Sequence, residues 1–384
     1  MRKQGKVPIL IFGNSDNCPE IQYLTGFLTS DAVIFLLNGL KGYLVVPEFE
    51  VNRAKAAVSS SFIEGITPST MDIVTPESLT GSGKKRKSLS LRTLRLLKAA
   101  KINHVKVSNF FPCGIVRDIE KAGISVTVSQ KALVPERAVK TRQEISMIKD
   151  AQQAAVIAMR AAITMIANAE IDGRKFLKVK GKYLVSEDVK HIICSVLMDH
   201  NCYCREVIVA GGLQAADPHM RGEGPLIAGQ AIVIDIFPRH NTHGYWGDLT
   251  RTVVRGQPSP KLKKMYYAVK SAQIAALNEI KAGAKCSIVH NRALNEFRSR
   301  GFNQEVMNGR KTGFIHNTGH GVGLEIHEAP SLGAGDERLK NGNVVTVEPG
   351  LYYPDIGGVR IEDVVVVTSR GWRYLVPCEK KFEI

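Results

Sequence analysis

Short apolar runs separated by polar turns dominate the first third of the chain, a pattern typical of strands alternating with helices. The runs at 32–37 and 42–47 are rich in apolar residues, and Asn38-Gly39 between them is a strong hairpin signal. The segment 59–90 is polar and is expected to be irregular. Further strands are predicted at 7–13, 102–108 and 124–129, and helices at 48–58, at 91–101 and between the last two strands.

The longer second part of the chain opens with a capped helix. Thr141-Arg-Gln-Glu144 is a capping box, and the apolar residues that follow it keep helical spacing up to Ala167. The pattern therefore predicts two domains, a small α/β domain in residues 1–135 and an α+β domain in residues 136–384. In the second domain, strands are predicted at 207–210, 231–237, 343–348 and 359–367, and helices at 259–282 and 286–299.

Composition and charge exclude several classes of protein. A chain of 384 residues with 44% hydrophobic residues can fill real cores, so a disordered protein is excluded. The 52 basic and 36 acidic residues give a net charge of +16, which raises the question of a polyanionic partner. The surplus is spread over both domains, however, and the only run is Lys84-Lys85-Arg86-Lys87, which a solvated loop explains more simply. No nucleic-acid partner is expected.

The cysteines and the apolar segments indicate the compartment. Seven widely spaced cysteines argue against a disulfide framework, and Cys202-Tyr-Cys204 has no second Cys/His pair at zinc-finger spacing. The apolar run at 7–12 is too short for a secretory signal, and the apolar run at 154–167 is too short for a membrane span. We therefore expect a cytoplasmic protein that makes no use of a membrane.

Five side chains of the second domain stand in apolar strands or glycine-rich segments, where a ligand role would explain them. Four are carboxylates, which are costly to bury unless they are paired, protonated or bound to a cation. Each acid, taken singly, is more simply a turn or salt-bridge residue. Together with one histidine, they would suit two divalent ions such as Mn²⁺, Co²⁺ or Zn²⁺. The five are Asp235, Asp248, His320, Glu348 and Glu362.

The segments around these side chains resemble a known family. VIDIF, GYWGDLTRT, GHGVGLEIHE, VTVEPGLYY and GGVRIEDVVVV are similar, in this order, to the signature segments of the pita-bread metallopeptidases. The segment IQYLTGF at 21–27 is similar to the creatinase-type domain of Xaa-Pro aminopeptidases and Xaa-Pro dipeptidases (prolidases). The resemblance implies a pita-bread catalytic domain in residues 136–384, preceded by a creatinase-like domain in residues 1–135.

The resemblance also implies a role for each ligand. Asp235 would chelate one metal ion, His320 and Glu348 would hold the other, and Asp248 and Glu362 would bridge both. Two cations in this arrangement would activate a water molecule as the nucleophile.

Three residues would act on the substrate. His219, in the segment AADPH, and His327 would hydrogen-bond the substrate carbonyl or the oxyanion that develops from it. Glu348 would also carry the proton to the leaving nitrogen. The spacing of seven residues between His320 and His327 does not by itself place them together.

The implied activity is hydrolysis of the N-terminal Xaa-Pro bond of a proline-containing peptide or dipeptide by a homodimeric exopeptidase. The sequence leaves open whether it is a dipeptidase or an aminopeptidase P. A methionine aminopeptidase would generally lack the N-terminal domain, and a non-catalytic scaffold that binds RNA or protein would not need five ligands. Two departures from the family are a 235–248 interval two residues longer than usual, which contains His240 and His243, and a Lys-rich segment at 175–190.

Overall fold

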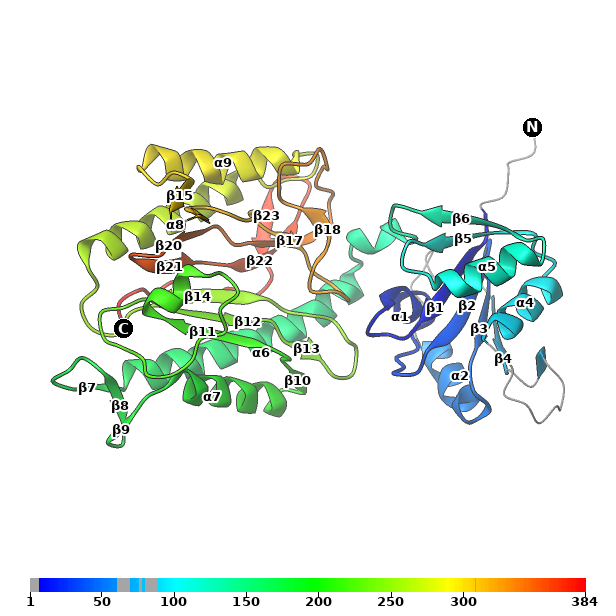
Figure 1. Ribbon diagram of the computed structural model, residues 1–384, viewed down its shortest axis with the longest axis horizontal. Helices are drawn as coiled ribbons and strands as arrows, with labels where there is room; N and C mark the ends of the chain where they lie inside the picture. Colours follow the sequence, from blue (N-terminus) through cyan, green and yellow to red (C-terminus); the bar gives the residue numbers. More distant parts are fainter. Residues whose placement is uncertain (1–6, 61–69, 76–77, 80–88, 308) are drawn as a thin grey trace. The chain divides into compact units, whose positions relative to one another are not determined.

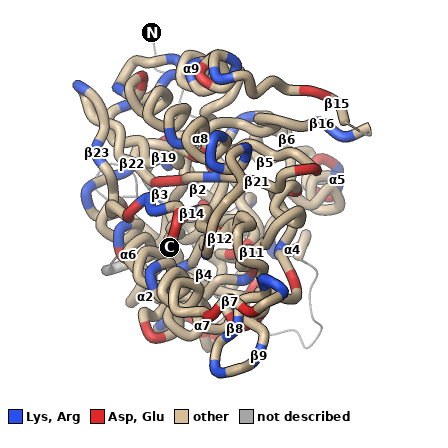
Figure 2. Tube along the Cα trace, turned by 90° about the vertical axis from the view of Figure 1, so that its left-hand side faces the viewer, with Lys and Arg blue, Asp and Glu red and all other residues tan. Residues whose placement is uncertain are grey.

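The computed structural model describes residues 7–60, 70–75, 78–79, 89–307 and 309–384. The chain forms two compact units, an N-terminal unit (Met1–Arg137) and a C-terminal unit (Ala138–Ile384). The basic run at 84–87 lies outside the described residues. Elsewhere basic and acidic positions are interspersed along the trace (Figure 2). Among the described residues, no helix combines the length and the apolar character needed to cross a membrane.

A six-stranded mixed sheet, in the order β4-β3-β2-β1-β5-β6, is the basis of the N-terminal unit (Figure 1). The predicted hairpin is confirmed, because Asn38 pairs with Lys41 across the turn. Gly39 has a φ of 61°, a left-handed conformation that glycine adopts at little cost. The helix predicted at 91–101 is α4 (Leu89–Ala99), and its Leu96 and Leu97 are buried in the core of this unit.

One prediction for the N-terminal unit was wrong, because the polar segment 59–90 contains the strand β4. This strand lies at the edge of the sheet and none of its residues is fully buried, so its sequence carries a weak apolar signal. The elements of the unit are β1 (Ile9–Gly13), α1 (Pro19–Thr25), β2 (Val33–Asn38), β3 (Lys41–Val45), α2 (Val51–Ser60), β4 (Thr70–Val74), α4 (Leu89–Ala99), β5 (His104–Ser108), α5 (Cys113–Lys121) and β6 (Ser125–Ser129), with 3₁₀ turns at Glu48–Glu50 and Pro135–Ala138.

The C-terminal unit consists of two helix pairs with sheets between them. Figure 1 shows α6 and α7 on one side of the strands and α8 and α9 on the other. One core packs α6 and α7 against a three-stranded sheet, β11-β12-β14. A second core packs α8 and α9 against a five-stranded sheet, β18-β17-β19-β22-β23, and against the β20-β21 hairpin. The α+β character predicted for this part of the chain is confirmed.

The elements of the C-terminal unit begin with the predicted capped helix, whose N-cap is Thr141. The helices are α6 (Arg142–Ala167), α7 (Ser186–Asp199), α8 (Pro260–Asn278) and α9 (Cys286–Ser299), with a 3₁₀ turn at Gly212–Ala216. The strands are β7 (Glu170–Ile171), β8 (Leu177–Val179), β9 (Lys182–Tyr183), β10 (Cys202–Tyr203), β11 (Val207–Gly211), β12 (Ile232–Ile236), β13 (Arg239–His240), β14 (Leu249–Val253), β15 (Glu305–Met307), β16 (Arg310–Thr312), β17 (His320–Gly321), β18 (Glu328–Ser331), β19 (Val344–Val347), β20 (Gly350–Tyr353), β21 (Gly357–Arg360), β22 (Asp363–Val367) and β23 (Trp372–Tyr374).

One predicted strand differs in the structure. The run at 359–367 is not one strand, because the chain leaves the β20-β21 hairpin at Arg360 and joins β19 from Asp363 onward. Ile361 and Glu362 form the step between the two sheets. The Lys-rich segment at 175–190 forms β8, β9 and the first turn of α7, in a small antiparallel sheet with β7.

A buried arginine, Arg251, links β14 to β22. Arg251 on β14 is 1% exposed and forms an ion pair of 2.6 Å with Asp363 on β22. Its guanidinium also donates to the carbonyls of Thr250, Glu362, Cys378 and Glu379. Because every donor of this buried cation finds an acceptor, the arginine links β14, β22 and the C-terminal segment.

Replacing Arg251 should destabilise the C-terminal unit. Arg251→Met leaves the buried Asp363, two buried carbonyls and two partly buried carbonyls without this donor, so the free energy of unfolding should fall by about 3 kcal/mol or more. Urea denaturation of the metal-free protein measures the change. Arg160→Met is the control, because its ion pair with Glu379 is exposed and should contribute about 1 kcal/mol or less. Equal effects of the two variants would contradict the prediction.

Candidate metal centre

The first two predicted ligands lie on neighbouring antiparallel strands. Asp235 on β12 is opposite Thr250 on β14, and Ile236 is opposite Leu249. Asp248 directly precedes Leu249, so the pairing places both aspartates at the same end of the two strands. The antiparallel pairing of β12 and β14 therefore brings the two aspartates together.

The other three predicted ligands come from the second half of the unit. His320 opens β17, and Glu348 directly follows β19. Glu362 lies at the step between β21 and β22, where the strand changes sheets. Glu362 N donates to Thr250 O across the two halves, which brings this carboxylate to the strand that follows Asp248.

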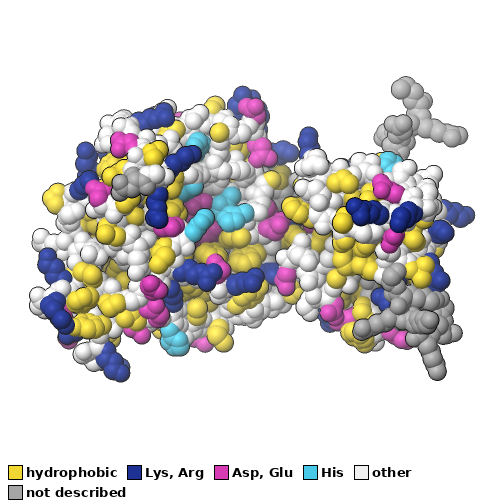
Figure 3. All heavy atoms as spheres, in the orientation of Figure 1, with side chains coloured by type: hydrophobic (Ala, Val, Ile, Leu, Met, Phe, Trp, Pro, Cys, Tyr) yellow, Lys and Arg dark blue, Asp and Glu magenta, His cyan; other side chains and the backbone are white. Residues whose placement is uncertain are grey.

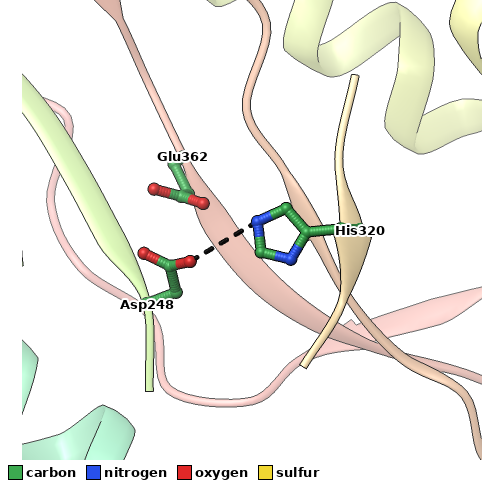
Figure 4. A group of neighbouring side chains, drawn as sticks. All are labelled: Asp248, His320 and Glu362. Atoms are coloured by element: carbon green, nitrogen blue, oxygen red, sulfur yellow. Dashed lines mark ion pairs between the residues drawn. The ribbon is translucent and has the colours of Figure 1, made fainter. Parts of the chain in front are cut away.

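Asp248, His320 and Glu362 form one compact group (Figure 4). One ligand atom of each side chain lies within 4.8 Å of the corresponding atoms of the other two. His320 Nε2 lies 3.6 Å from Asp248 Oδ2 and 3.3 Å from Glu348 Oε1. Asp235 lies outside this group of three, because its Oδ2 accepts a hydrogen bond of 2.7 Å from Arg360.

Arg360 and Tyr352 are site residues that the sequence analysis missed. Arg360 is buried, and besides Asp235 it donates to Thr250 Oγ1 and to the Tyr352 hydroxyl. Thr250 in turn donates to Glu362 Oε2 at 2.7 Å. Arg360 precedes the candidate ligand Glu362 by two residues, and an arginine in an otherwise apolar strand was the available signal.

The carboxylates raise one another's pKa. Burial is the largest cause for both Asp248 and Glu362, and the charges of neighbouring carboxylates act in the same direction. The pKa of Glu362 rises to about 8, and that of Asp248 rises well above its ordinary value. The pKa of Asp235 is also raised by burial, although Arg360 opposes the shift. Three buried acids therefore resist ionisation in the absence of a further cation.

His320 and Glu348 shift each other in the opposite sense. Burial opposes the charged form of both, but their mutual attraction outweighs it. The pKa of His320 is raised to about 9 and that of Glu348 is lowered to about 2. This pair is stable as an imidazolium and a carboxylate, and a cation that binds Glu348 would replace the imidazolium charge.

The residues present fit a divalent metal centre. Asp235 Oδ1 is buried and has no hydrogen-bond partner among the described residues. His320 Nδ1 lies 3.1 Å from the Gly321 carbonyl, and donation there leaves Nε2 to face the carboxylates as a ligand atom. Four carboxylates and one imidazole are oxygen-rich donors that suit hard or borderline cations. The unpartnered oxygen, the histidine tautomer and the surplus of negative charge all favour a cation.

Three further histidines, His219, His316 and His327, lie near the candidate ligands His320 and Glu348. The rings of His320 and His327 meet edge to face with centroids 4.4 Å apart. His327 is exposed, and its pKa is lowered by burial of part of the ring and by the nearby His320 and His219. His316, missed by the sequence analysis, is held between Tyr352 and the carbonyl of Asn317. In Figure 3, histidine side chains gather around acidic ones where the C-terminal unit is hollowed.

Helix α6 fixes the segment that carries Asp248. The Gln152 side chain accepts from Asp248 N at 2.7 Å and donates to Asp248 O at 2.8 Å. A Cβ on Gly247 would lie 2.7 Å from the backbone of Ala151 and Gln152, so only glycine fits against the helix there. The Tyr245 hydroxyl donates to Glu144, the capping-box residue of α6. A helix at the start of the unit thus holds a ligand about 100 residues later.

His240 and His243 build the lengthened loop before Asp248. Their rings stack with centroids 3.8 Å apart and planes 4° from parallel. His240 Nδ1 accepts from Thr242 N, and His243 Nδ1 accepts from Tyr245 N. His240 therefore ends the short strand β13, where it pairs with Cys202, and His243 lies in the turn that follows.

The chain belongs to the metallopeptidase family M24, which its residues 146–369 match. It is therefore a metal-dependent hydrolase of peptide bonds with the pita-bread fold. It is 28% identical to an Xaa-Pro dipeptidase from Pyrococcus horikoshii over 94% of this chain and 92% of the relative.

Two solved structures share the fold over nearly the whole chain. An Xaa-Pro dipeptidase from Bacillus anthracis has a TM-score of 0.79 at 26% identity, covering 98% of this chain and 95% of that one. An X-Pro aminopeptidase from Thermotoga maritima has a TM-score of 0.79 at 23% identity, covering 98% and 97%. The fold is thus equally similar to proteins with these two names.

The metal-free protein should lose stability as pH rises between about 6.5 and 9. The pKa of His320 is raised from 6.5 to about 9, and that of Glu362 from 4.5 to about 8. A group whose pKa is raised by folding stabilises the folded state below its unfolded pKa. That contribution is lost as pH rises through the folded pKa. Both groups therefore lower the free energy of unfolding as pH rises. Thermal denaturation in excess chelator measures the change.

Glu362→Gln provides the matched control, because glutamine keeps the size of the side chain and has no titratable proton. Its melting temperature should depend less on pH over this range than that of the unaltered protein. A melting temperature of the unaltered protein that rises with pH in the same window would refute the expectation.

Proposed function

We propose that the protein is a dinuclear metallo-exopeptidase that hydrolyses the N-terminal Xaa-Pro bond of peptides. The observation that carries this proposal is the grouping of Asp248, His320 and Glu362, with Glu348 beside His320 and a buried, unpartnered oxygen on Asp235. Family membership and the names of the relatives, among them an Xaa-Pro dipeptidase, support the substrate class. We further propose a homodimeric enzyme, as the sequence resemblance implies, and a cytoplasmic one, as the cysteine pattern and the short apolar runs indicate.

The five candidate ligands would bind two divalent ions. In this proposal Asp235 would hold one ion, His320 and Glu348 would hold the other, and Asp248 and Glu362 would be shared by the two. The ions supply a water of lowered pKa and polarise the scissile carbonyl when bound. Arg360 then has a positioning role, because it keeps the second oxygen of Asp235 engaged and fixes Thr250 against Glu362.

The protein's own groups handle the substrate. His219 and His327 are exposed, and the His327 ring lies against that of the candidate ligand His320. An imidazole N–H in this place would donate to the carbonyl oxygen as it becomes negative. The lowered pKa of His327 keeps the ring neutral near pH 7, so that it can act as a donor without adding charge. Glu348 would receive the proton of the attacking water and pass it to the proline nitrogen.

The first test is a substrate panel with metal-stripped protein reloaded with Mn²⁺, Co²⁺ or Zn²⁺. We expect cleavage of Xaa-Pro peptides and none of a matched Xaa-Ala peptide. Cleavage confined to dipeptides identifies a dipeptidase, and cleavage of longer Xaa-Pro peptides identifies an aminopeptidase P. Selective cleavage of Met-Ala peptides would instead indicate a methionine aminopeptidase. Absence of both metal and activity would favour a binding scaffold.

The second test separates metal ligands from substrate contacts. Asp248→Ala should abolish turnover and lower the metal content, because it removes a bridging carboxylate. His327→Ala should lower kcat by about two orders of magnitude, the scale of one lost oxyanion contact, and keep the metal. Steady-state kinetics and elemental analysis of each variant measure both quantities. Full metal occupancy with full activity in Asp248→Ala would overturn the ligand assignment.

A further inference from the structure

A buried ion pair contacts the loop at 322–327, which carries His327. Lys140 Nζ contacts Glu328 Oε1, and the two side chains are only 1% and 7% exposed. Glu328 directly follows His327 and opens β18, where it lies opposite Gly321. The pair therefore joins the start of the C-terminal unit to the residue next to a candidate catalytic histidine, 188 positions away.

The carboxylate of Glu328 also shapes the turn between His320 and His327. Glu328 Oε2 accepts from Glu325 N at 3.4 Å. A Cβ on Gly323 would lie 2.5 Å from Glu328 Oε1, so the backbone of the turn packs directly on the carboxylate. On its other side the turn is held by Trp246, whose backbone N–H donates to Gly323 and whose indole N–H donates to Leu324.

The backbone around Lys140 is also held in place by hydrogen bonds. Its backbone N–H donates to Gly342 O at 2.9 Å, and Asn343 Nδ2 donates to Ala138 O at 2.7 Å. The next residue, Thr141, is the N-cap of α6 and is locked by the capping box. A lysine loses much side-chain freedom on burial, and the Lys140 ammonium donates both to Glu328 Oε1 and to Ala138 O, the latter at 3.4 Å.

We propose that Lys140 is a positioning residue for the peptidase reaction, which acts through Glu328 to set the place of His327. This proposal rests on the proposed function, because His327 is taken there as the contact to the substrate carbonyl. A shift of about 1 Å in such a group is enough to slow a reaction by about a hundredfold. The ligand His320 is held independently, since its backbone N–H donates to Thr346.

The kinetic test compares three variants. Lys140→Met should lower kcat by about ten- to a hundredfold while KM and metal content stay near those of the unaltered protein. Lys140→Arg should restore most of kcat, because it restores a cation that can reach Glu328. In Lys140→Met/Glu328→Met the charges are removed together, so folding is preserved, but the carboxylate that shapes the turn is missing. We expect kcat of this double variant to stay low, and its full recovery would show that Lys140 only neutralises a buried charge.

Arg137→Met is the matched control. Arg137 lies three residues before Lys140 and pairs with Glu20, with side chains 9% and 16% exposed. It has a comparable buried ion pair, and the partner Glu20 belongs to the N-terminal unit. Its kcat should match that of the unaltered protein below the melting temperature. A loss equal to that of Lys140→Met would attribute the effect to general destabilisation and overturn the proposal.

Hydrogen exchange tests the same inference without activity. In the metal-free protein, Lys140→Met should speed amide exchange in peptides that cover residues 319–328 and leave the sheet strands β1 and β2 unchanged. Unchanged exchange at 319–328 would overturn the positioning role, as would faster exchange with normal kcat. If the unaltered protein cleaves no Xaa-Pro peptide, the proposed function fails, and the exchange result still decides whether the ion pair fixes the loop.

Discussion

Like charges confined in a buried space are the constraint on which the C-terminal unit depends. Asp235, Asp248, Glu348 and Glu362 share a site in which Arg360 and His320 are the cations that contact them. Burial and mutual repulsion raise the pKa of three of these acids, so the fold bears a cost for holding them together. A metal centre reverses the sign of that cost, because the same carboxylates become ligands.

Holding the acids in place requires rigid supports from distant parts of the chain. Gln152 on α6 fixes the backbone of Asp248 by two hydrogen bonds, and Arg251 on β14 donates to the carbonyl of Glu362. Arg360 joins Asp235 to Thr250 and Tyr352. These supports are themselves buried, and each of their side-chain nitrogen and oxygen atoms has a hydrogen-bond partner, which preorganises the ligands before any ion arrives.

Elements of the fold could be predicted from the sequence where the local pattern of residues specifies them. The capping box at Thr141, the turn at Asn38-Gly39 and the helix at 286–299 follow from residues close together in the chain. Of the five candidate ligands, the four acids stood out in or beside apolar strand segments, and His320 stood out in a glycine-rich segment. The edge strand β4 was missed because an exposed strand has no strong apolar signal, and the break at Glu362 was missed because a strand that changes sheets looks continuous in sequence.

Residues that position the ligands through contacts with distant parts of the chain could not be predicted from the sequence. Nothing near Gln152 in sequence shows that its amide pairs with the backbone of Asp248, because that contact exists only once α6 packs against β14. The same holds for Lys140 and Glu328, whose charges are ordinary until both are buried. Ligands are therefore visible as residue types in context, whereas the groups that position them become visible only with the fold. A motif match alone thus tests whether the chemistry is present, and the surrounding contacts decide how well it is aligned.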